Sequence, residues 1–239
     1  MSSSENTYQG VDNLEVMSEA KNYNAWLRDN LVSRCAAGSA VLDFGSGSGT
    51  FARLMRDAGF SVTCVEPDAL LAGRLSVEGF EVVPRCEDLG DRRFDFIYTL
   101  NVLEHIENHQ AAMSSLAARL TTGGTLLVYV PAFPILFGPM DRKVGHVRRY
   151  RAQHLAELAR SCELDIGVIR YADSLGFLAA LVHRFIGSSD GVLSRRAVVA
   201  YDSLVFPASR VLDRLAGGLV GKNLLMIAHS PDGRRIGSI

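Results

Sequence analysis

Apolar residues follow two alternating patterns along most of the chain, one typical of buried strands and the other typical of helices. Short runs rich in β-branched and aromatic residues predict seven strands, at residues 40–44, 61–66, 80–84, 94–100, 125–131, 164–171 and 223–230. After the first strand, Phe51, Leu54 and Ala58 recur at helical spacing, and similar patterns follow later strands. Because several strands are apolar throughout, we expect a sheet that is buried on both faces. The pattern predicts an α/β fold with a doubly wound, mostly parallel seven-stranded sheet.

Three segments exceed what such a sheet needs. Residues 1–34 are predicted to form an N-terminal tail and one lid helix, which contains Tyr23 and could close over a cleft. Residues 132–151 form a loop of about 20 residues after the fifth strand, and loops of that length are usually functional. Residues 173–222 predict a helical cap insertion between the sixth and seventh strands. We therefore expect a ligand-binding domain over residues 35–239 that carries this insertion.

Two further helical features follow from spacing and from proline. Ile106, Met113 and Leu120 fall on one face of a helix after the fourth strand. That helix is expected to end at Gly123. Within the insertion, Pro207 is expected to kink or divide the second helix.

Composition narrows the class of protein. The 239 residues are 48% hydrophobic and 21% charged, with 25 basic and 26 acidic side chains and a formal net charge of −1. These values exclude a disordered chain and argue against a nucleic-acid partner. The four cysteines lie far apart without a C-x-x-C pair, so we expect neither a disulfide framework nor a zinc site from them. No basic leader precedes an apolar run and no apolar run approaches about 18 residues, so we expect a cytoplasmic protein without a transmembrane segment.

The chain is nevertheless slightly apolar on average. Its mean hydropathy is +0.12. Part of this value comes from strands buried on both faces, and we expect the excess to lie mainly in residues 173–222.

A glycine-rich turn joins the first strand to the helix after it. Residues 41–50 read VLDFGSGSGT, in which glycines allow positive φ angles and a close approach of the backbone to a ligand. Glu66 ends the next strand, where a carboxylate can accept both hydroxyls of a ribose. Strand, turn, helix and acid together predict a cofactor that contains a nucleoside. The alternative is a glycine turn that binds no ligand.

The spacing of the glycines selects among nucleoside cofactors. A dinucleotide loop reads G-x-G-x-x-G, whereas this loop reads D-x-G-x-G-x-G and begins with Asp43. An acid there is unfavourable beside a pyrophosphate but suits an ammonium and a sulfonium, so a nicotinamide dehydrogenase is disfavoured. This loop and VEPD at 65–68 resemble motifs of class I S-adenosylmethionine-dependent methyltransferases. FDFIYTLNVLEHI at 94–106 and LTTGGTLLVYVPA at 120–132 resemble later motifs of their small-molecule type 11/12 branch, which implies a Rossmann-like fold.

The resemblance implies S-adenosylmethionine as the cofactor and a set of residues that contact it. These are Asp43, Gly45, Ser46 and Gly47 on the methionine and ribose side, Glu66 at the ribose hydroxyls, Pro67, Asp68 and Glu87 around the adenine, and Leu100 and Asn101 at the cofactor methionine. Glu87 is included because Arg85 stands where many relatives have an adenine-binding aspartate.

Methyl transfer to a hydroxyl requires a positioned acceptor and a base. His146 is the first candidate for this base, because it lies in the long loop within the segment D-x-x-x-G-H-x-R-R-Y at 141–150. This segment resembles that of a bacterial subgroup of these enzymes, some of them associated with cell-envelope or glycolipid pathways. The alternative is that His146 and Asp141 only pin the loop. His105, which follows the fourth strand, is the rival base.

Metal and substrate contacts complete the expected site. A Glu-His pair similar to Glu104-His105 binds a divalent metal in some quinone-pathway relatives, but here no additional neighbouring carboxylate completes an obvious site, so no metal is expected. The residues expected to contact the substrate are Tyr23, Arg148, Arg149 and Tyr150. The two arginines suit a phosphate or carboxylate, although they could equally pair with surface acids.

Together these features predict transfer of a methyl group to a hydroxyl oxygen of a small, hydroxylated, lipid-linked or glycosylated metabolite, and the arginines favour an anionic one. The alternatives are a non-catalytic partner subunit that binds S-adenosylmethionine, and an N- or C-methyltransferase of a natural-product intermediate. The insertion could receive an apolar acceptor, contact a membrane surface, lie in a dimer interface or enlarge the core. We expect a monomer or a homodimer.

Overall fold

The computed structural model describes residues 11–186, 194–215 and 218–231. Their seven-stranded sheet has the order β3-β2-β1-β4-β5-β7-β6. Its strands are β1 (Val41–Phe44), β2 (Val62–Val65), β3 (Glu81–Val83), β4 (Phe94–Leu100), β5 (Leu120–Pro131), β6 (Asp165–Ala172) and β7 (Asn223–His229). Neighbouring strands are parallel except around β7, which is antiparallel to both β5 and β6. The predicted doubly wound, mostly parallel sheet is confirmed.

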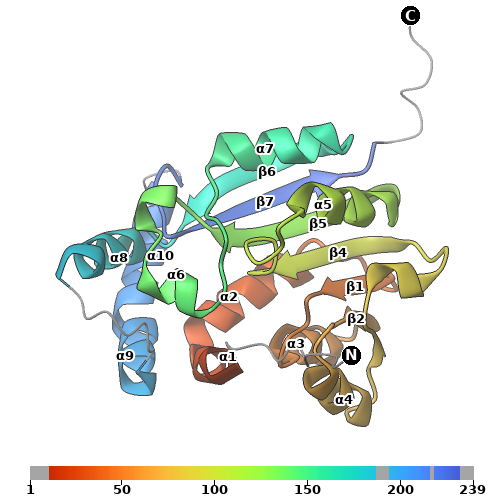
Figure 1. The fold of residues 1–239 in the computed structure, drawn as a ribbon, viewed down its shortest axis with the longest axis horizontal. Coiled ribbons are helices and arrows are strands. Elements are labelled where there is room, and N and C mark those ends of the chain that lie inside the picture. The colour runs from red at the N-terminus through yellow and green to blue at the C-terminus, as the bar shows by residue number, and fades with distance from the viewer. Residues whose placement is uncertain (1–10, 187–193, 216–217, 232–239) are drawn as a thin grey trace, which may run out of the picture.

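Helices cover both faces of this sheet (Figure 1). One face carries α5 (His109–Ala118) and α7 (Ala152–Ser161), and the other carries α2 (Lys21–Val32), α3 (Thr50–Asp57) and α4 (Ala69–Val77). Successive residues of a strand enter opposite clusters of core residues, as Phe96 and Ile97 do in β4. Both faces therefore need apolar side chains, which explains the uninterrupted apolar runs.

Two predicted boundaries are wrong. The helix that was expected to reach Gly123 ends at Ala118, and Leu120 begins β5. Leu120 is 2% exposed and pairs with Phe94 of β4, so its apolar side chain serves the sheet and not the helix. The N-terminal segment also contains two helices, α1 (Val11–Ser18) and α2, where one was expected.

The insertion forms α8 (Ser174–Ile186), α9 (Arg195–Ala200) and α10 (Phe206–Leu215). A π-helical turn between α9 and α10 ends just before Pro207, which has no N–H to continue regular helical bonding. Figure 1 shows these helices, together with α6 (Pro139–Lys143) of the long loop, at the end of the sheet where the parallel strands finish. Ligands of doubly wound sheets bind at that end.

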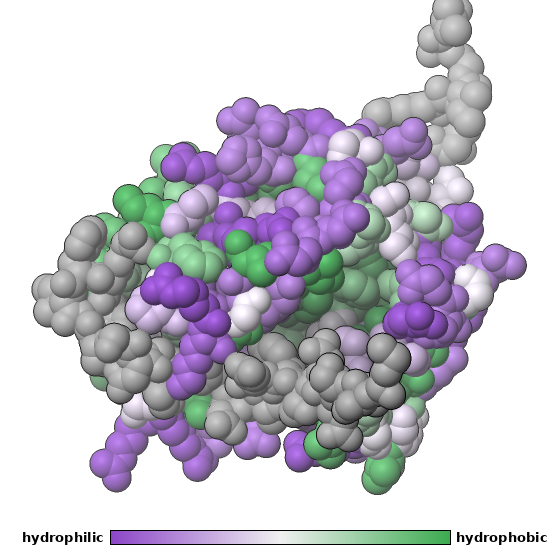
Figure 2. Space-filling view, viewed as in Figure 1, coloured by the Kyte–Doolittle hydropathy of each residue, from purple (hydrophilic) through white to green (hydrophobic). Residues whose placement is uncertain are grey.

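The insertion carries much of the exposed apolar surface. Nine of the fourteen exposed large hydrophobic side chains among the described residues belong to it. Figure 2 shows apolar residues at the left edge of the molecule, over α8. None of the helices in the described ranges has the length and apolar character needed to cross a bilayer. The apolar excess is therefore local to the insertion, as predicted.

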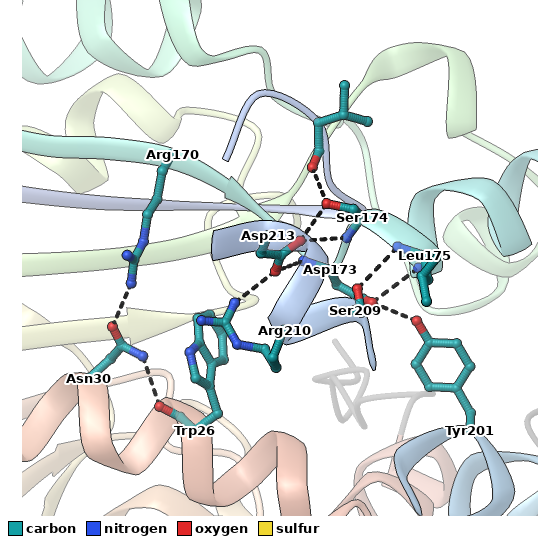
Figure 3. Close-up of polar contacts among 12 residues, drawn as sticks. Trp26, Asn30, Arg170, Asp173, Ser174, Leu175, Tyr201, Ser209, Arg210 and Asp213 are labelled. Carbon is teal, nitrogen blue, oxygen red and sulfur yellow. Dashed lines mark hydrogen bonds and ion pairs between the residues drawn. The ribbon is translucent and has the colours of Figure 1, made fainter. Parts of the chain in front are cut away.

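Helix α10 buries two polar side chains beside Phe206 and exposes several apolar ones. Ser209 and Asp213 are 0% and 7% exposed, whereas Val211 and Leu215 are 56% and 81% exposed. The Asp213 carboxylate accepts hydrogen bonds from the backbone N–H of Ser174 at 3.0 Å and pairs with Arg210 at 2.7 Å (Figure 3). This buried polar face holds α10 against α8 and the end of β6.

The insertion is also bound to the lid helix α2. The Arg210 guanidinium lies over the Trp26 ring, 4.3 Å from its centroid. Asp202 is 3% exposed, and its carboxylate accepts hydrogen bonds from the backbone N–H of Asn22 and of Tyr23, both at 2.8 Å. These are among the N–H groups that an isolated helix leaves without partners. A side chain of the insertion therefore caps the helix that carries Tyr23.

Replacing Asp213 should destabilise the protein. In Asp213→Asn the Arg210 side chain, which is 17% exposed, loses its ionic partner. We expect the free energy of unfolding to fall by about 3 kcal/mol, because breaking a buried ion pair leaves an uncompensated charge. Urea unfolding measures this change. Arg214→Gln, an exposed substitution on the same helix, is the control, and an equal loss in both variants would contradict the importance of the buried face.

Candidate active site

The glycine loop turns sharply between β1 and α3. Gly45, Gly47 and Gly49 have φ angles of 81°, 53° and 79°, in the region that side chains disfavour. A Cβ atom on Gly45 would lie 2.4 Å from Cγ2 of Val102, so a side chain there would collide with the segment after β4. Ser46 donates from its hydroxyl to the backbone oxygen of Asp43 at 3.1 Å. The loop therefore requires glycine for its conformation and for its close packing.

Glu66 fastens this loop to the end of β2. Its carboxylate accepts hydrogen bonds from the backbone N–H of Gly47 at 2.6 Å and of Asp68 at 2.9 Å. The side chain is 6% exposed, and burial raises its pKa. Each carboxylate oxygen retains a lone pair. Glu66 is therefore preorganised to accept hydrogen bonds from hydroxyl groups, and this acceptor chemistry fits the ribose of S-adenosylmethionine.

Two other predicted cofactor residues make strong contacts within the chain. Asp43 is 3% exposed and accepts a hydrogen bond from the Tyr98 hydroxyl at 2.9 Å. Burial raises the pKa of Asp43 to about 7. Asp68 caps α4 by accepting hydrogen bonds from the backbone N–H of Leu70 and Leu71. Both carboxylates thus hold neighbouring segments of the predicted site in place.

The remaining predicted cofactor residues lie around the same strand ends. Leu100 ends β4, and Asn101 follows it with a φ angle of 55°. Pro67 is exposed beside Glu66, and Glu87 is exposed in a short turn after β3. No contact in the described structure distinguishes Glu87 as an adenine partner.

Tyr23 brings the lid helix to the end of β4. Burial raises the pKa of its hydroxyl to about 12, and the neighbouring Asn101 side chain acts in the opposite direction. The Tyr23 ring packs edge to face with Tyr129 and Phe206, at centroid distances of 6.1 and 5.6 Å. The predicted substrate residue Tyr23 is therefore fixed beside Asn101 by both the sheet and the insertion.

The long loop is built around the buried carboxylate of Asp141. This carboxylate accepts hydrogen bonds from the backbone N–H of Gly138 at 2.9 Å, from Nδ1 of His146 at 2.7 Å, and from Nε and Nη2 of Arg149 at 2.9 and 3.0 Å. Burial alone would raise the pKa of Asp141, but these bonds outweigh it and hold the pKa below its ordinary value. Because Nδ1 of His146 donates to Asp141, Nε2 is left as the basic nitrogen.

His146 meets the two residues that follow β4. Its Nε2 lies 3.8 Å from Oε1 of Glu104, and its ring lies edge to face with His105 at a centroid distance of 4.7 Å. Glu104 is 0% exposed, and neither carboxylate oxygen has a hydrogen-bond partner in the described ranges. Burial raises the pKa of Glu104 to about 8, and burial together with His146 lowers the pKa of His105 to about 4. Donor atoms of these three side chains lie within 4.8 Å of one another, an arrangement that could hold a metal ion.

Of the other predicted substrate residues, Arg149 and Tyr150 make contacts within the chain, and Arg148 is partly exposed. Arg149 is engaged by Asp141 and by the backbone oxygen of Ala132, so its guanidinium holds the loop. Tyr150 is 2% exposed and donates from its hydroxyl to the backbone oxygen of Leu103 at 3.1 Å. Arg148 remains partly exposed and donates to the backbone oxygen of Glu107 at 2.8 Å. Of the two arginines, Arg148 keeps more donors available for an anion.

No local sequence pattern predicts that the side chains of Glu104, His105 and His146 lie close together. Glu104 and His105 adjoin each other, but His146 belongs to a different loop. The acid that completes the group is not the extra carboxylate sought beside Glu104. It is Glu104 itself, which is buried with no hydrogen-bond partner for its carboxylate among the described residues, while Asp141 orients His146.

This fold and this loop define the class of S-adenosylmethionine-binding, Rossmann-like methyltransferases. A family described as a methyltransferase domain matches residues 14–166. The chain belongs to this family of methyltransferase domains.

Several solved structures share the fold at low sequence identity. A putative sarcosine dimethylglycine methyltransferase from Galdieria sulphuraria is 17% identical, with a TM-score of 0.60 over 89% of this chain and 86% of that one. A methyltransferase from Archaeoglobus fulgidus is 16% identical, with a TM-score of 0.58 over 88% and 94%. Phosphoethanolamine N-methyltransferase 2 of Haemonchus contortus, solved with S-adenosyl-L-methionine, is 18% identical, with a TM-score of 0.58 over 88% and 53%.

Two curated relatives match a smaller part of the chain. Both are uncharacterized proteins of Mycobacterium tuberculosis, 27% identical over 134 residues, which is 51% of this chain and 45% of theirs. The match therefore spans about half of each protein.

Changing Glu66 should weaken cofactor binding. In Glu66→Gln one carboxylate oxygen becomes an amide that cannot accept a hydroxyl or the Gly47 N–H. We expect the affinity for S-adenosylmethionine, measured by titration calorimetry, to fall by about 10- to 100-fold, as expected for lost hydrogen bonds to a charged group. Glu157→Gln, an exposed change on α7, is the matched control. Unchanged affinity in Glu66→Gln would place the cofactor elsewhere.

Proposed function

We propose that this methyltransferase transfers the methyl group to a hydroxyl oxygen of a small metabolite that is lipid-linked or glycosylated. The observation that carries this proposal is the hydrogen bond from His146 to Asp141, which leaves Nε2 of His146 as a basic nitrogen facing Glu104 and His105. Amines with a free lone pair need no such base, whereas a hydroxyl must lose its proton as the methyl group arrives.

The chain's own residues have three tasks in this reaction. Glu66 and the glycine loop hold the cofactor, and S-adenosylmethionine supplies an electrophilic methyl group when bound. Tyr23 packs against Tyr129 of β5 and Phe206 of the insertion, so it holds the lid helix at the sheet and limits where the acceptor can lie. His146 accepts the proton of the acceptor hydroxyl, and Asp141 orients the imidazole and stabilises its positive charge. Positioning alone is worth several kcal/mol in such displacements.

The insertion supports an acceptor with an apolar part. The helices that carry its exposed hydrophobic residues lie at the end of the sheet where ligands bind, and α8 lies beside α6 of the loop that carries His146 (Figure 1). Arg148, which remains partly exposed, supports an anionic group such as a phosphate or carboxylate on the same acceptor.

N-methylation is the second candidate function, and Glu104 is the observation that favours it. Its buried carboxylate has no hydrogen-bond partner in the part of the chain that the structure describes, which suits a cationic or amine acceptor. Two similar structures are named for N-methylation or for sarcosine and dimethylglycine. The alternative of a non-catalytic partner subunit predicts cofactor binding without turnover.

Label transfer from S-adenosylmethionine to panels of hydroxylated lipids, glycosides and amines separates these functions. We expect label on hydroxyl oxygen, and His146→Ala to lower kcat by at least ~100-fold, because a general base contributes about that much. Cofactor affinity should not change. His154→Ala, an exposed histidine on α7, is the control. Full turnover in His146→Ala together with loss in His105→Ala would contradict the assignment, and label only on nitrogen would overturn O-methylation.

A further inference from the structure

Glu104 occupies a position that a carboxylate rarely tolerates alone. Its side chain is fully buried, and neither oxygen has a hydrogen-bond partner in the described part of the chain. The cation that would neutralise it most directly, Arg149, is bound through two nitrogens to Asp141. A buried carboxylate of this kind requires either a proton or a cation that enters the site.

Two imidazoles face this carboxylate. The donor atoms of Glu104, His105 and His146 lie within 4.8 Å of one another, and Nε2 of His146 is 3.8 Å from Oε1 of Glu104. Two ligand atoms of a tetrahedral zinc ion, each at ~2.1 Å from it, lie about 3.4 Å apart, so binding would require these side chains to move together by about 1 Å.

Asp141 gives His146 the surroundings of a metal ligand. It accepts the Nδ1–H of His146 at 2.7 Å, and this bond directs the lone pair of Nε2 toward Glu104. A carboxylate on the far nitrogen is the usual outer partner of a metal-binding histidine, since it fixes the tautomer and raises the basicity of the ligand.

We propose that Glu104, His105 and His146 bind one divalent transition-metal ion. Two imidazoles and one carboxylate suit zinc, cobalt, iron or manganese better than magnesium or calcium, which prefer ligands that are all oxygen. Three protein ligands leave a coordination position open, as in sites where a metal ion acts on a substrate.

The role of this ion rests on the proposed O-methyl transfer. An acceptor hydroxyl at the open position would have a lowered pKa and would release its proton to solvent. The oxygen would then form its bond to the methyl carbon as the carbon–sulfur bond breaks, and the electron pair of that bond would stay on sulfur. Nε2 of His146 is the base described above when no ion is bound; with the ion bound, Nε2 would hold the ion and the lowered pKa of the hydroxyl would replace that base.

Cobalt(II) binding tests the site without any turnover. The full-length protein is treated with a chelator, dialysed and titrated with Co²⁺ while the visible absorption bands are recorded, and Zn²⁺ and Mg²⁺ are titrated by calorimetry. We expect one Co²⁺ or Zn²⁺ per chain and much weaker binding of Mg²⁺. Glu104→Gln and His105→Ala should each lower the Zn²⁺ affinity by at least ~100-fold, and Asp141→Asn by about 10- to 100-fold.

The control variant is His154→Ala, which removes a histidine outside the group and should bind Co²⁺ like the unmodified chain. Calorimetry with S-adenosylmethionine confirms that each variant is folded. Absence of stoichiometric Co²⁺ and Zn²⁺ binding, or equal losses in His154→Ala and Glu104→Gln, would overturn the metal site. If the chelator-treated protein binds no metal but still methylates a hydroxyl, the metal site is refuted and the proposed O-methyl transfer stands. Tight metal binding without label on any hydroxyl supports the site and refutes the proposed function.

Discussion

The long loop keeps its shape because one buried carboxylate, that of Asp141, binds groups from three parts of it. The backbone N–H of Gly138, the Nδ1 of His146 and the guanidinium of Arg149 all donate to it. Charge-assisted bonds of this kind are stronger than neutral ones, and the Arg149 pair is bidentate. Without Asp141 the loop would leave Arg149 and His146 without their main partners, and Nε2 of His146 would no longer be directed at Glu104.

Around the site, other pairs of segments are likewise held together by one buried carboxylate each. Glu66 joins the glycine loop to the end of β2, Asp202 caps the lid helix, and Asp213 holds α10 in place. Each acid accepts backbone N–H groups that would otherwise lack partners. Glu104 is the exception among these acids, because neither of its carboxylate oxygens has a hydrogen-bond partner among the described residues. Apolar packing does not compensate a buried carboxylate, which is why a bound cation is proposed beside it.

Much of the fold follows from local patterns, whereas the site depends on contacts that such patterns do not encode. The strands could be predicted because a parallel sheet buried on both faces demands unbroken apolar runs. The end of the helix that contains Met113 was predicted wrongly, because the spacing of Leu120 from Met113 suits a helix although Leu120 begins β5. In α10 the apolar positions Val211 and Leu215 do not mark the buried face, since they are exposed while Ser209 and Asp213 are buried. Glu66 could be predicted from its place at a strand end, but His146 meets Glu104 only through the tertiary fold.

A crystal structure of the complex with S-adenosylhomocysteine tests the central claim most directly, because it locates both the ribose and the sulfur. The account predicts that the ribose hydroxyls contact Glu66 and that the sulfur faces the group formed by Glu104, His105 and His146. A sulfur atom directed away from that group, with other side chains around the position of the departing methyl, would contradict the account.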